Sequence, residues 1–174
     1  MAEEMLNSIL EWCFENTNIL SARENDSFER TFLHFVSMKG YVKVVAKILA
    51  KGVEIDPTDN SILTPLHLAS NLGQTEVARL LVQNGANVDF RDEKQRTPLH
   101  SAAIYGHMDL LKLLIKSGAN VHQLDILEYT PLHDASCRGS LNIVQLLLDN
   151  GAQVNSWQKD NKTALYLASK KGHT

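Results

Sequence analysis

A four-residue segment that recurs at a fixed spacing constrains the fold of this chain more than any other feature. The sequence Thr-Pro-Leu-His begins at Thr64, Thr97 and Thr130, at intervals of 33 residues. Weaker copies begin at Thr31 and Thr163, one interval outside this group on either side. Five copies at one period indicate a repeat architecture, in which each repeat is one structural unit that packs on its neighbours.

The copy that begins at Thr64 shows how one repeat is expected to fold. Thr64 is a good N-cap, and Pro65 suits the first helical position, where its missing N–H is not needed. A short helix therefore begins here, and we expect it to end at Gly73, since glycine accepts the left-handed conformation of a helix stop. Thr75 can begin a second helix with an apolar stripe, which Gly85 ends. A polar loop then leads to the next copy.

Two series of glycines repeat with the same period and mark the helix ends. Spaced 33 residues apart, they are Gly40, Gly73, Gly106, Gly139 and Gly172 in the first series and Gly52, Gly85, Gly118 and Gly151 in the second. A single helix pair of this length cannot bury its apolar face, whereas stacked pairs bury it against each other. The pattern therefore predicts an all-α solenoid of stacked helix pairs.

The repeated unit resembles a known family. Thr-Pro-Leu-His followed by Ala, a turn Gly and a Leu-Leu segment that ends in Gly-Ala is similar to the ankyrin repeat, from roughly residue 28 to the end. The resemblance implies antiparallel helix pairs with β-hairpin-like finger loops that project at right angles. It also implies a concave face, built from the fingers and the first helices, where such proteins usually bind other proteins.

One set of positions departs from the family pattern. Ankyrin repeats often have glycine two residues before the threonine, at the finger turn, but this chain has Ile62, Gln95, Glu128 and Asn161 there. Asparagine tolerates a positive φ, whereas isoleucine, glutamine and glutamate tolerate it poorly. We therefore expect the first three of these fingertips to differ in shape from those of the family.

The period also divides the chain into segments. Residues 1–27 are predicted to form an N-terminal capping helix and linker, because apolar residues recur there at helical spacing. The predicted ankyrin repeats span residues 28–60, 61–93, 94–126, 127–159 and 160–174. The fifth stops where its second helix should begin. We interpret this as truncation of something longer, and the alternative is that the lone helix serves as a half-cap.

Charge and composition narrow the range of partners. A net charge of −3 gives no general attraction to phosphate backbones, which argues against nucleic acid as the main partner. No apolar run reaches membrane-spanning length, so no membrane insertion is expected. Cys13 and Cys137 are best explained as free thiols in a reducing compartment. We therefore expect a monomer in the cytoplasm, the nucleus or both.

No motif for catalysis or cofactor binding is present in the sequence. The periodic histidines, His34, His67, His100 and His133, lie on successive repeats and are not clustered at ligand distance. We interpret each imidazole as bonded to backbone or to the threonine hydroxyl of its own repeat, with metal binding as the alternative. The sequence thus predicts no enzyme activity, no cofactor and no metal site.

Partner binding is expected where the repeats differ, because positions that pack must agree. By resemblance, the residues before each turn glycine line the concave face, and one fingertip carries a run of large apolar residues that needs a reason if exposed. Aromatic anchors are typical of binding hot spots. The predicted partner-binding residues are Met38, Leu72, Tyr105, Leu124, Ile126, Leu127, Tyr129 and Trp157, with Asp134 and Arg138 as a polar rim. The alternative is that these apolar residues pack together and stiffen neighbouring fingers.

A modification site is also suggested by the sequence. The segment from Leu146 to Asn155 is similar to segments that asparaginyl hydroxylases modify in ankyrin proteins, with Asn155 as the candidate residue.

Taken together, these patterns predict a non-catalytic protein–protein interaction module, a scaffold or adaptor that binds another protein through its concave groove and finger loops. One alternative is the targeting or substrate-recruiting part of a larger enzyme, such as a kinase or ubiquitin-ligase subunit. Another is a short stand-alone inhibitor resembling the inhibitor-of-NF-κB class. No residue identifies the partner.

Overall fold

The computed structural model describes residues 28–173, which fold into helices joined by loops. The helices are α3 (Phe32–Lys39), α4 (Val42–Leu49), α5 (Pro65–Asn71), α6 (Thr75–Gln83), α7 (Pro98–Tyr105), α8 (Met108–Lys116), α9 (Pro131–Arg138), α10 (Leu141–Asp149) and α11 (Ala164–Lys170). No strand forms within this described range, so the prediction of an all-α fold is confirmed. The capping helix predicted within residues 1–27 lies outside the described residues.

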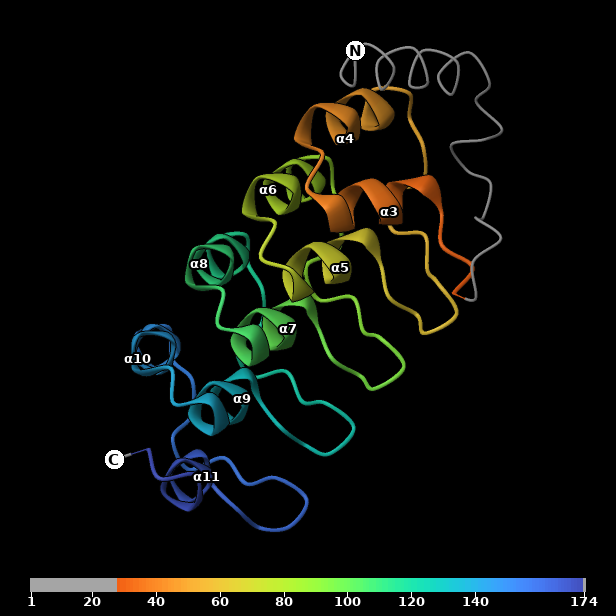
Figure 1. Ribbon diagram of the computed structural model, residues 1–174. Coiled ribbons are helices and arrows are strands. Elements are labelled where there is room, and N and C mark those ends of the chain that lie inside the picture. Colours follow the sequence, from red (N-terminus) through yellow and green to blue (C-terminus); the bar gives the residue numbers. More distant parts are fainter. Residues whose placement is uncertain (1–27, 174) are drawn as a thin grey trace.

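The helices are stacked in two parallel rows (Figure 1). In the first row, α3, α5, α7, α9 and α11 each contact the next, and in the second row α4, α6, α8 and α10 do the same. Each helix of the first row from α3 to α9 also contacts the second-row helix that follows it in sequence. The loops that precede the first-row helices extend to the right in Figure 1, as the predicted fingers do.

Aliphatic side chains between the two rows form one continuous core. Val45, Ile48, Leu81, Leu111 and Leu147 are fully buried there, one or two from each helix of the second row. They lie on the apolar stripes that the sequence shows at helical spacing. Because each stripe packs on the neighbouring helices, the stack is held together by contacts between adjacent repeats.

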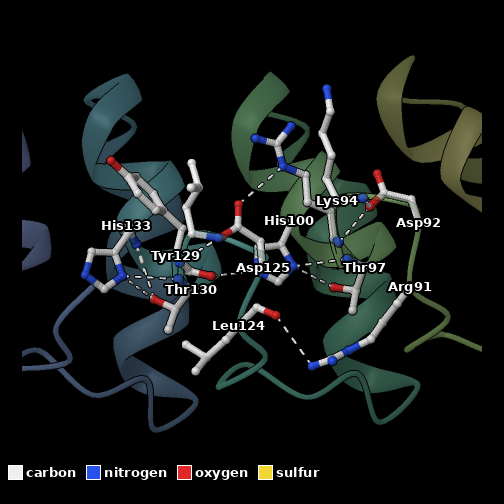
Figure 2. Close-up of polar contacts among 12 residues, drawn as sticks. Arg91, Asp92, Lys94, Thr97, His100, Leu124, Asp125, Tyr129, Thr130 and His133 are labelled. Atoms are coloured by element: carbon white, nitrogen blue, oxygen red, sulfur yellow. Dashed lines mark hydrogen bonds and ion pairs between the residues drawn. The ribbon is translucent and has the colours of Figure 1, made fainter. Parts of the chain in front are cut away.

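The four periodic histidines lie in the first turn of four first-row helices, α3, α5, α7 and α9. In each capping box the backbone N–H of the threonine donates to Nδ1 of the histidine three residues later, at 3.1–3.2 Å. Since Nδ1 accepts, the ring proton is on Nε2, which donates to a carbonyl oxygen at the base of the following finger. The acceptors are Leu63, Arg96, Tyr129 and Ser156, at 2.9–3.1 Å. Figure 2 shows this arrangement around His100.

These contacts confirm that each histidine bonds within its own repeat, and they add a link to the next repeat that the sequence did not suggest. Burial opposes protonation of the imidazoles. It lowers the pKa of His67 and His133, and it lowers the pKa of His100 to about 4. His67, His100 and His133 are therefore neutral structural groups near pH 7.

The shape of the fingertips differs from our expectation. Glu29, Ile62, Gln95, Glu128 and Asn161 all have a positive φ, between 54° and 63°. The prediction that the first three of the tips at Ile62, Gln95, Glu128 and Asn161 would differ in shape is therefore wrong. All of these residues adopt the conformation that glycine would take, although only asparagine accepts it readily.

An aspartate at the start of the turn explains why the strained residue is tolerated. At the tip of residues 92–96, Oδ1 of Asp92 accepts the backbone N–H groups of Lys94 and Arg96, both at 2.8 Å. Asp59 and Asp125 hold their tips in the same way. These hydrogen bonds to a charged acceptor offset the cost of the left-handed residue between them.

Candidate partner-binding surface

Adjacent fingers are joined through their backbones. Glu93 donates its backbone N–H to the carbonyl of Ser61 at 3.1 Å, and Ile126 donates to Lys94 at 2.9 Å. The next finger continues the series, with Lys159 donating to Leu127 at 3.2 Å. Figure 2 shows the two tips that begin with Asp92 and Asp125. These backbone hydrogen bonds thus help to fix the spacing of the fingertips.

The side chains that the sequence assigned to partner binding are largely exposed at these tips. Leu124, Ile126, Leu127 and Trp157 are between 41% and 61% exposed. Each of these side chains thus has about half of its surface open to a partner, and the alternative, in which they pack together to stiffen the fingers, stays a prediction as well. An exposed group of large apolar side chains is typical of a binding surface.

Tyr129 differs from its neighbours because it is more buried than they are. Its ring lies 5.6 Å from the imidazole of His133, centroid to centroid, and its carbonyl accepts the Nε2 proton of His100. Burial raises the pKa of its hydroxyl. Tyr129 therefore contributes to the packing of the finger base, and a substitution there would test folding and binding together.

On the helices, the predicted residues lie at or near the C-terminal ends of the first-row helices. Leu72 follows α5 and Tyr105 ends α7, and both are about half exposed, at 52% and 48%. Met38 in α3 is half-buried, and its carbonyl accepts a hydrogen bond from Gln74. The Tyr105 ring is stacked on His107, with centroids 6.3 Å apart, which restricts its orientation.

Asp134, assigned to the polar rim, lies below the surface. It is buried in α9, and its Oδ2 accepts no hydrogen bond from any described residue. Desolvation raises its pKa to about 8, so that the neutral carboxylic acid predominates at pH 7. A side chain this buried does not form part of an exposed polar rim.

Arg138, the other rim residue, is exposed but holds two repeats together. Its Nη1 donates to the carbonyl of Ile104 at 3.0 Å. In other repeats, Gln74, His107 and His173 make the equivalent link from the position after the turn glycine. Ser140 occupies that position in α9–α10 and is too short, so Arg138 makes the link instead. The sequence contains the signal for this difference, because Ser140 is short whereas Gln74, His107 and His173 at the same position are long.

Other features bear on the remaining sequence predictions. Within residues 28–173, no group of three histidine, cysteine, aspartate or glutamate residues is arranged to hold a metal ion. The same part of the chain has no helix long and apolar enough to cross a membrane. Asn155 is exposed in the loop between α10 and α11, where an enzyme can reach it. Its hydroxylation stays a prediction.

Comparison with models of protein families shows which family this chain belongs to. The family model described as ankyrin repeats (3 copies) matches residues 2–92, 33–125, 82–158 and 122–174, which together cover nearly the whole chain. This chain belongs to the ankyrin-repeat family. A comparison with curated proteins gave no significant match. Ankyrin repeats are generally protein–protein interaction modules, so the broad class of function predicted from the sequence fits the family.

Proposed function

We propose that this ankyrin-repeat protein is a non-catalytic module that binds another protein through its fingertips and concave face. The observation that carries the proposal is the exposure of Leu124, Ile126, Leu127 and Trp157 on fingers whose backbones are already fixed. A backbone that is already held in place loses little further entropy on binding, so more of the hydrophobic free energy of burying these side chains contributes to the complex.

The proposal can be tested by capture of partners from a cell lysate with matched variants. The binding variant is Ile126→Ser with Trp157→Ser, since both side chains are more than half exposed. The control is Leu141→Ser, which changes an apolar side chain that is 73% exposed but lies on the second row of helices, in α10.

Quantitative mass spectrometry should find proteins that the wild type and the Leu141 variant retain equally and that the fingertip variant loses. Circular dichroism must show that all three proteins are folded. Equal retention by the folded fingertip variant would contradict the proposal.

We propose separately that Asn155 is hydroxylated. Its exposure in a loop supports access by a modifying enzyme. Mass spectrometry of protein purified from cells should show the mass of one additional oxygen atom on the peptide that contains Asn155. A fully unmodified peptide would contradict this.

A further inference from the structure

Charged side chains link successive fingertips in a regular way. Nε of Arg30 lies 3.4 Å from Oδ2 of Asp59, and Nε of Arg96 lies 3.5 Å from Oδ2 of Asp125. Each arginine directly precedes a capping threonine, and each aspartate begins the next fingertip, 29 residues later. At the last pair of tips both charges are replaced together, by Tyr129 and Gln158. The two positions are therefore matched in charge.

One pair breaks this rule. Leu63 occupies the position of the arginine, but Asp92 retains the carboxylate. Asp92 is only 8% exposed. Its Oδ1 is used by the backbone of its own tip, whereas Oδ2 accepts no hydrogen bond from the residues that the structure describes. A carboxylate that has no cationic partner among the described residues can pair with a cation that another molecule supplies.

A cavity lies beside this carboxylate. Its volume is about 200 Å³, far more than the roughly 10–15 Å³ that a single water requires. Leu63, Asp92, Ser101 and Tyr105 are among the residues that line it. One repeat further along, Arg96 takes the place of Leu63.

At the next junction between repeats, where Arg96 lies, Asp134 takes the place of Ser101. Leu63 and Ser101 are shorter than their counterparts Arg96 and Asp134. Between the second and third repeats they therefore leave open the space that corresponds to the one where the guanidinium of Arg96 pairs with Asp125.

The other charged groups of the cavity do not neutralise Asp92. The lining also contains Glu93, Lys94 and Arg96. Arg96 is paired with Asp125, and the opposite charges of Glu93 and Lys94 cancel. What remains is the negative charge of Asp92, in a recess where contact with a cation is less screened than on an open surface.

We propose that this cavity binds an arginine side chain of the protein partner, with its guanidinium on Oδ2 of Asp92 and against the ring of Tyr105. The pairing of Arg96 with Asp125 shows which cation the position accepts. Arginine suits the site better than lysine, because its planar group both pairs with a carboxylate and stacks on an aromatic ring. The inference rests on the proposed function and specifies one chemical feature of the partner.

The probe for this site is N-acetyl-arginine amide, titrated into isotope-labelled protein while NMR amide shifts are recorded. A ligand of this size is expected to bind with a dissociation constant on the order of millimolar. The shifts should saturate and should centre on Asp92, Ser101 and Tyr105. The corresponding citrulline derivative, which is nearly isosteric but neutral, should bind at least about tenfold more weakly.

Two variants separate a specific site from general attraction. Asp92→Asn retains a side-chain oxygen for the turn and removes the charge, so binding should weaken about tenfold. Leu63→Arg supplies an internal arginine like Arg96 and should close the cavity, so the probe shifts should disappear. Because Arg30 and Arg96 occupy the same position in neighbouring repeats, this variant is expected to fold.

The proposal is overturned if no saturable shift occurs in the wild type, if the citrulline or lysine derivative binds as well as the arginine one, or if Leu63→Arg binds the probe unchanged. Failure here is distinct from failure of the proposed function. If the fingertip variant still loses its partners while Leu63→Arg retains them and ignores the probe, protein binding stands and only the arginine site is wrong.

Discussion

The base of each finger and its tip differ in how much their residues vary from one repeat to the next. At the base, threonine and histidine recur in four repeats, are buried, and make the same hydrogen bonds each time. At the tip, the backbone follows the same path in every repeat, but the side chains change from charged to apolar. The comparison teaches that uniform residues maintain the stack, whereas variable residues on a uniform backbone are free to serve recognition.

Loss of a base residue should have the largest effect on stability. His100→Ala removes a buried ring that bonds Thr97 and the carbonyl of Tyr129, leaving both without their partner. We expect the free energy of unfolding to fall by about 3 kcal/mol. The control is His122→Ala, because His122 is exposed, and its effect should stay within about 0.5 kcal/mol. Urea denaturation of both variants provides the measurement, and equal losses would contradict the assigned role.

The pH dependence of the free energy of unfolding should show whether Asp134 is buried in its protonated form. Its pKa is raised from 3.8 to about 8 in the folded protein. The folded state therefore holds a proton that the unfolded state releases, and the contribution of Asp134 to stability falls as pH rises from about 4 to 8.

Asp134→Asn removes this dependence, so the variant should be more stable than the wild type by about 2 kcal/mol at pH 8 and no more stable near pH 4. Thermal unfolding at the two pH values tests this. A constant difference between variant and wild type would contradict burial of the acid.

The glycines that end the two helices of a repeat offer a matched pair. Gly106 has φ 81°, and an added Cβ would lie 2.7 Å from Nε of Arg138. Gly118 has φ 90° and nothing within 4 Å. Gly118→Ala should cost about 1 kcal/mol from backbone strain alone, and Gly106→Ala about 2 kcal/mol because it also displaces Arg138. Denaturation midpoints that rank the two variants in the reverse order would contradict the Arg138 link.

The strained residues at the tips should give the smallest effect. Ile62 is β-branched and has φ 60°, so Ile62→Gly is expected to stabilise the protein by about 0.5–1 kcal/mol. Asn161 has nearly the same φ, 58°, but tolerates it, and Asn161→Gly should change stability by less than about 0.3 kcal/mol. Equal effects in a chemical denaturation series would show that the tips are not strained.

Much of the fold could be predicted from the sequence, because the period aligns residues that must pack alike. The threonine caps, the turn glycines and the hydrogen-bonded histidines follow from local chemistry that recurs in successive repeats. The resemblance to the ankyrin repeat also placed Ile126 and Trp157 on projecting fingers, and both side chains are more than half exposed.

The rest depended on contacts between particular side chains and backbone groups, within a fingertip or between repeats. The positive φ of Ile62 is tolerated because Asp59 accepts two N–H groups of its tip, and the sequence alone did not assign that role to the aspartate. The cavity at Asp92 could not be seen either, because it depends on which residue of one finger faces which residue of the next. The propensities of single residues do not contain this information, because the turn depends on an aspartate two to four residues away and the cavity on residues 29 positions apart.

The division between base and tip is tested most directly by two quantities measured on one variant, Ile126→Ala with Trp157→Ala. These are its dissociation constant for a captured partner and its free energy of unfolding. Exposed side chains that serve recognition should weaken binding at least about tenfold and change the free energy of unfolding by less than about 0.5 kcal/mol. A loss of more than about 2 kcal/mol in stability, with the dissociation constant of the folded protein unchanged, would show that the tips serve the stack and not the partner.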